Sequence, residues 1–114
     1  MEKVAIVGCG AYMDNGYGCA GEWRCLKAAA LGEGNFANPS QVIAFVKCEC
    51  PGRSLASNVG VAIKMLEMKP DVIYLSSCFA NAKPACPYND VQEIAEILED
   101  KTGIQVFPGT HNYI

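Results

Sequence analysis

Cysteine is the residue type in this sequence whose number and placement could do chemistry. The chain of 114 residues has seven cysteines and one histidine. An odd count fits a disulfide framework poorly, and the apolar run after Met1 is too short for a signal peptide or a membrane span. We therefore expect a cytoplasmic protein with reduced thiols. Thiolates together with an imidazole suit zinc, an iron–sulfur cluster or redox chemistry.

The elements that must position these thiols follow from the hydrophobic pattern. Nearly continuous apolar runs, typical of strands buried on both faces of a parallel sheet, lie at 4–7, 42–46 and 72–75, and a fourth run lies at 104–107. Apolar residues at helical spacing predict helices at 21–31, 52–68 and 90–102. Asp90 can cap the last helix and Gly103 can end it. This alternation predicts one α/β domain over residues 1–114. We expect a small three-layer fold, in which helices cover both faces of an open sheet of about four parallel strands, as in flavodoxin-like proteins.

The predicted strands deliver most of the cysteines and the histidine to one edge of the sheet. Parallel strands end at the same edge, which is where open α/β sheets place their sites. Cys19 and Cys86 lie in longer loops of that edge, whereas Cys25 falls inside the first helix. We predict a site for zinc or an iron–sulfur cluster there, made from Cys9, Cys19, Cys48, Cys50, Cys78, Cys86 and His111.

A structural role for the cysteines is the interpretation to weigh against this site. Cysteine is among the most frequently buried residue types, so some of the seven could simply fill the core. Core residues would favour the apolar elements, yet all but Cys25 are predicted in loops, which favours a convergent site. The paired cysteine spacing of a zinc ribbon is absent, so spacing does not identify the metal. Seven thiols also exceed the four ligands of one zinc ion, which leaves room for a cluster, two ions or a reactive pair beside a metal.

Cys50 suggests an alternative, a thiol-dependent enzyme. Pro51 suits the first position of the second helix, which would put Cys50 at a helix N-terminus beside Arg53. Both features stabilise a thiolate and favour a bound anion. Cys50 would be the nucleophile, Arg53 the clamp for a small oxyanion, and Cys48 or Cys78 the resolving thiol in oxyanion or disulfide chemistry. Four residues separate Cys48 from Arg53, whereas the thiol phosphatase motif has five, which counts against this alternative.

Composition and missing motifs disfavour other classes of function. A net charge of −3 and a pI near 5.0 argue against binding nucleic acid or an anionic membrane. The run Gly8-Cys9-Gly10 lacks the third glycine of the dinucleotide fingerprint, and the chain has no Walker sequence. A structural or interaction domain with inert, reduced cysteines remains the third possibility.

Several segments together resemble the CGGC domain family. They are Cys25-Leu26-Lys27-Ala28, Phe45–Arg53, Leu75-Ser76-Ser77-Cys78, Cys86-Pro87-Tyr88 and Gly109-Thr110-His111. The resemblance covers nearly the whole chain and implies a small protein that binds metal through cysteines and histidines. The family's name motif has two glycines between its cysteines, whereas Glu49 alone separates Cys48 from Cys50 here. The Glu49 carboxylate could then be a substitute ligand or face the solvent.

Overall fold

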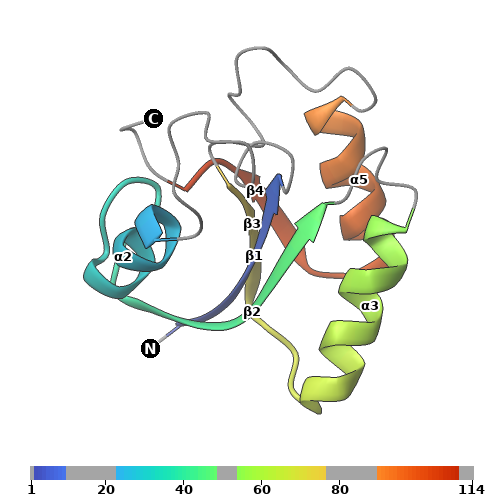
Figure 1. The fold of residues 1–114 in the computed structure, drawn as a ribbon, viewed down its shortest axis with the longest axis horizontal. Coiled ribbons are helices and arrows are strands. Elements are labelled where there is room, and N and C mark those ends of the chain that lie inside the picture. The colour runs from blue at the N-terminus through green and yellow to red at the C-terminus, as the bar shows by residue number, and fades with distance from the viewer. Residues whose placement is uncertain (1, 10–22, 49–53, 77–89, 111–114) are drawn as a thin grey trace.

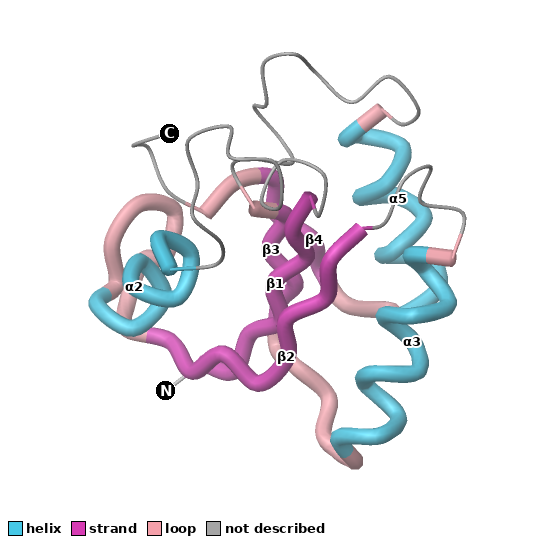
Figure 2. The backbone as a smooth tube through the Cα atoms, in the orientation of Figure 1, coloured by secondary structure: helices cyan, strands magenta, loops and turns pink. Residues whose placement is uncertain are grey.

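In the part of the chain that the structure describes, four parallel strands form the sheet, in the order β2-β1-β3-β4 (Figures 1 and 2). The structure, a computed structural model, describes residues 2–9, 23–48, 54–76 and 90–110. Strands and helices alternate within these ranges as β1 (Glu2–Cys9), α2 (Trp23–Leu31), β2 (Ser40–Cys48), α3 (Leu55–Leu66), β3 (Val72–Leu75), α5 (Val91–Thr102) and β4 (Gln105–Pro108). The predicted small α/β fold is therefore confirmed. Its strand order equals that of the first four strands of a flavodoxin-like sheet.

Two apolar clusters hold helices against opposite faces of the sheet. Figure 1 shows α2 on one side and both α3 and α5 on the other. On the α2 side, Val4 and Ile6 of β1 belong to the same cluster as Cys25. On the other side, Ala5 and Val7 belong to a cluster that includes residues of α3 and α5. Because side chains alternate between the faces of a strand, β1 is buried on both, as its continuous apolar sequence predicts.

Helix α5 begins and ends where its capping residues predict. The Asp90 carboxylate accepts a hydrogen bond of 2.8 Å from the backbone N–H of Gln92, one of the amides that lack a partner inside the helix. Gly103 adopts a left-handed φ of 70°, and its N–H donates to the carbonyl of Glu99. Both predicted signals, the aspartate cap and the glycine stop, are confirmed.

Element ends near the candidate site differ from the prediction. Parallel pairing of the backbone extends β1 to Cys9 and β2 to Cys48. The prediction that these cysteines lie in loops after the strands is therefore wrong, because each is the last residue of its strand. Helix α3 begins at Leu55, where the apolar ladder itself begins, and not at residue 52.

Gly32 lies in the turn after α2, where replacement by alanine is expected to be costly. Gly32 and Gly103 have nearly equal left-handed φ angles, 69° and 70°. A Cβ at Gly32 would lie 2.7 Å from the backbone nitrogen of Pro39, whereas at Gly103 the nearest atom is the flexible Lys69 Nζ at 3.6 Å. We expect Gly103→Ala to cost about 1 kcal/mol of unfolding free energy, and Gly32→Ala to cost about 1–3 kcal/mol more because backbone must move. Urea unfolding measures both, and equal losses would contradict this account.

Candidate metal centre

The backbone register brings Cys9 and Cys48 side by side at the carboxyl edge of the sheet. They are Cα partners, each closing its strand, and neighbouring strands lie about 4.8 Å apart. A register shift between Val4 and Ala5 creates this pairing, since Val4 pairs with Val42 but Ala5 pairs with Ala44. Without the extra residue in β2, the partner of Cys9 would be Lys47. The shift therefore aligns two of the predicted ligands.

The same register shift decides which face of the sheet Cys48 occupies. A one-residue shift moves side chains to the opposite face of a strand. Val42, before the shift, packs against the α2-side cluster. Cys48, after the shift, is 5% exposed and belongs to the cluster on the α3 and α5 side, with Val46 packed against that cluster. Cys48 is thus a buried thiol at the end of a strand, close to the start of α3.

The structure describes three of the cysteines to different extents. Cys48 and Cys25 are fully described, and the backbone of Cys9 is described. The other predicted site residues lie outside the described residues; they are Cys19, Cys50, Cys78, Cys86, His111 and, for the alternative enzyme, Arg53. Within the described ranges, no three histidine, cysteine, aspartate or glutamate residues gather as a metal site. The pair at 9 and 48 is what the structure brings together.

Thr110 fixes the chain immediately before His111. It is fully buried, and its hydroxyl and the Cys25 thiol form a hydrogen bond of 3.2 Å. Its carbonyl accepts a hydrogen bond of 3.1 Å from the N–H of Asn35, in the loop after α2. The N–H of the preceding Gly109 donates a hydrogen bond of 2.7 Å to the carbonyl of Leu75. Residues from α2, its following loop and β3 therefore all hold the segment that leads to the histidine.

Cys25 thus has a structural role, which its predicted position inside a helix already suggested. Its sulfur is completely buried in α2 and joins two segments that are 85 residues apart in sequence. The anchoring role of Thr110 was missed, because a threonine after a strand carries no signal for a distant thiol partner. Cys25 and Thr110 therefore hold the segment before His111 in place, although neither residue is a predicted ligand.

Thr110 provides a test of this anchor. Thr110→Val keeps the side-chain shape but removes the hydroxyl, which leaves the buried Cys25 thiol without this contact. We expect a loss of about 1 kcal/mol of unfolding free energy, measured by urea denaturation. Thr110→Ser, which keeps the hydroxyl, is the matched control and should lose less than Thr110→Val. A valine variant more stable than the serine variant would show that the hydrogen bond is unimportant.

Helix α3 starts later in the chain than the thiol-dependent enzyme alternative assumed. The cap residue is Ser54, with φ −96° and ψ 1°, and the first helical residue is Leu55. The prediction that Pro51 is the first helical residue is therefore wrong. Cys50 and Arg53 themselves lie outside the described residues. Thiolate activation at Cys50 therefore stays a prediction.

Comparison with known proteins decides the family. The CGGC domain profile matches residues 3–111. The chain belongs to the CGGC domain family. An uncharacterized protein of Methanocaldococcus jannaschii is 31% identical to this CGGC domain over 120 residues, which cover 98% of this chain and 88% of the relative. No solved structure matches the chain significantly.

Family membership supports a role in metal binding for this CGGC domain. The resemblance noted in the sequence is confirmed over nearly the full length of the chain.

Among the described residues, none of the helices is long and apolar enough to cross a membrane.

Proposed function

We propose that this CGGC domain binds zinc or an iron–sulfur cluster through cysteines and His111 at the carboxyl edge of its sheet. The observation that carries the proposal is the register pairing of Cys9 with Cys48, the two residues that close adjacent parallel strands. Ligand sites of open α/β sheets lie outside this edge. Family membership points to the same chemistry.

Short stretches of chain connect further candidates to this edge. Cys50 follows the end of β2 by two residues, Cys78 follows the end of β3 by three, and His111 follows the end of β4 by three. Extended chain spans at most about 3.6 Å per residue, so three residues reach no further than about 11 Å. Cys19 and Cys86 are the additional candidates, from longer connections.

The donor set fits soft, thiolate-binding centres. Zinc takes four cysteine or histidine ligands in a tetrahedron, and iron–sulfur clusters are held mainly by four cysteines. The six candidate cysteines and one histidine exceed either requirement. We propose Cys9, Cys48, Cys78 and His111 as the core of the set, with Cys50, two residues after the end of β2, as the alternative thiol.

Anaerobic purification followed by elemental analysis and an absorption spectrum tests this proposal. Stoichiometric zinc without colour, or iron with labile sulfide and visible absorption, is the expected result. Protein that is purified without metal, and that takes up neither zinc nor a reconstituted cluster, would overturn it. The spectrum also decides between the two centres, because zinc has no visible absorption and a cluster does.

Metal binding by thiols should depend on pH in one direction. Thiolate ligands must lose their protons, so binding releases protons. We therefore expect zinc affinity to fall as pH drops from 8 to 6, measured by competition with a chromophoric chelator. The affinity falls in this direction because protons compete with the metal for the sulfur atoms. An affinity that rises as pH drops would contradict thiolate ligation.

A further inference from the structure

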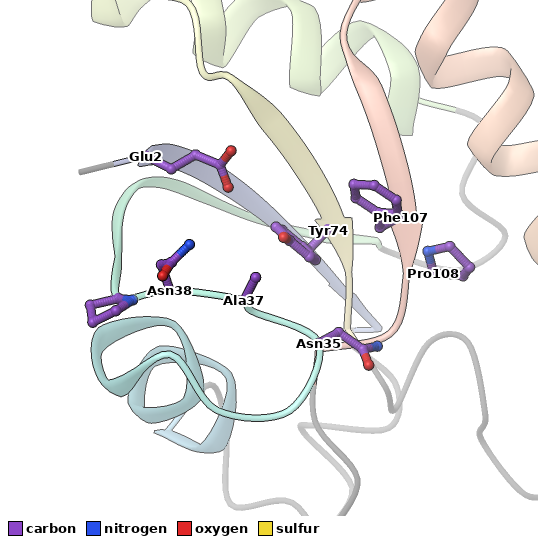
Figure 3. A pocket seen from close by; sticks show the side chains of 8 residues that line it. Glu2, Asn35, Ala37, Asn38, Tyr74, Phe107 and Pro108 are labelled. Atoms are coloured by element: carbon purple, nitrogen blue, oxygen red, sulfur yellow. The ribbon is translucent and has the colours of Figure 1, made fainter.

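A second candidate site lies on the α2 side of the sheet, away from the face that holds Cys48. It is a pocket with a volume of about 610 Å³ between the start of β1, the loop after α2, and strands β3 and β4. Pockets of about 300–1,000 Å³ commonly hold small molecules. Figure 3 shows Glu2 and Asn38 at one end, Phe107 and Pro108 at the other, and Tyr74 between them.

Two aromatic rings form the apolar wall of this pocket. The rings of Tyr74 and Phe107 come from paired residues on β3 and β4, with centroids 5.7 Å apart. The ring of Phe36 packs against the ring of Tyr74, with a distance of 4.2 Å between the two centroids. Tyr74 is 5% exposed but Phe107 is 40% exposed, so Phe107 offers open ring surface to an occupant. Helix α5 packs on the opposite face and does not cover these rings.

The charge of the pocket is negative. Glu2 is the one charged side chain among its described lining residues, and the amides of Asn35 and Asn38 add hydrogen-bonding groups. Burial and, secondarily, the charge of Glu2 raise the pKa of the Tyr74 hydroxyl above its ordinary value. Tyr74 therefore stays neutral near pH 7, and the net charge in the pocket comes from Glu2.

We propose that this pocket binds a small organic cation, with the positive group at Glu2 and an apolar body against Tyr74 and Phe107. The ammonium group gains from the Glu2 carboxylate, and the apolar body gains from burial against the aromatic rings. The asparagine carbonyls can accept hydrogen bonds from an ammonium group. An anion would meet Glu2 without a compensating cation among the described lining residues. This site is separate from the proposed metal centre, so either can fail without the other.

Benzylamine is a suitable probe, because it carries an ammonium group on an aromatic ring. Titration of the full chain, followed by amide shifts in NMR spectra, should give saturable binding with shifts around the pocket. Benzyl alcohol, a neutral analogue of similar shape, should bind at least about tenfold more weakly, and benzoate should not bind measurably. Absence of saturable benzylamine binding, or equal binding of the alcohol, would overturn the proposal.

Matched variants identify the two recognition elements. Glu2→Gln should weaken benzylamine about three- to tenfold and leave benzyl alcohol unchanged, in line with the strength of a single charge contact. Phe107→Ala should weaken both probes. Glu96→Gln, which removes an exposed carboxylate from α5 on the other face, is the control and should bind like the unmodified protein. A benzylamine affinity that is unaffected by Glu2→Gln would overturn the assignment. Metal content that is unchanged in the variants would show that the metal centre is intact.

Discussion

Replacement of Cys48 by alanine is expected to lower metal affinity by at least about a hundredfold. Loss of a residue that only supports a ligand costs about 10–100-fold, and Cys48 is proposed as a ligand itself. Its position supports this role, because it closes β2 and is the backbone partner of Cys9. The measurement is a competition titration with a chelator, using protein reconstituted with zinc.

Cys25→Ala is the matched control for Cys48→Ala. Both thiols are buried, with exposures of 0% for Cys25 and 5% for Cys48, so each substitution removes a similar buried sulfur. Cys25 lies in α2 and bonds to Thr110, which precedes the proposed ligand His111, so its loss should reduce stability and lower zinc affinity by about tenfold or less, well below the effect of Cys48→Ala. Equal effects of the two substitutions on affinity would mean that Cys48 is a core residue and not a ligand.

Leu98→Ala is expected to cause a large loss of stability. Leu98 lies on α5, is 1% exposed, and belongs to the cluster that joins α3 and α5 to the sheet. Removing a buried leucine costs about 2–5 kcal/mol, from lost burial and from the cavity that remains. Urea unfolding, monitored by circular dichroism, measures the change in unfolding free energy.

Ile97→Ala is the control, since Ile97 is the neighbouring residue of the same helix and is 45% exposed. It should cost less than about 1 kcal/mol, because little apolar surface is lost and no cavity forms. A cost for Ile97→Ala that equals the cost for Leu98→Ala would show that α5 does not pack on the sheet as described.

The elements of this fold were predictable because burial on both faces makes parallel strands continuously apolar. Val72–Leu75 is such a strand, and its predicted bounds match the structure. Strands β1 and β2 extend beyond their apolar runs because backbone pairing, which the side-chain pattern does not report, includes Glu2 and Cys48. The start of α3 was predicted too early because proline and glycine after Cys50 resemble a helix entrance, whereas Ser54 is the cap.

Of the candidate site, the nearness of Cys9 and Cys48 was predictable, but their direct pairing was not. Topology alone brings the strand ends to one edge, so the sequence order was enough to place Cys9 near Cys48. Their direct pairing depends on the register shift between Val4 and Ala5, which no residue type signals. The Cys25–Thr110 bond is equally hidden, because it joins residues that are distant in sequence.

The central claim is that cysteine sulfur at the carboxyl edge binds the metal. X-ray absorption spectroscopy of the zinc-loaded protein tests it most directly, because it reports the atoms around the metal. We expect sulfur neighbours at about 2.3 Å, with a histidine nitrogen at about 2.0–2.1 Å, and fewer sulfur neighbours in Cys48→Ala than in Cys25→Ala. A zinc ion surrounded by oxygen and nitrogen alone would contradict it.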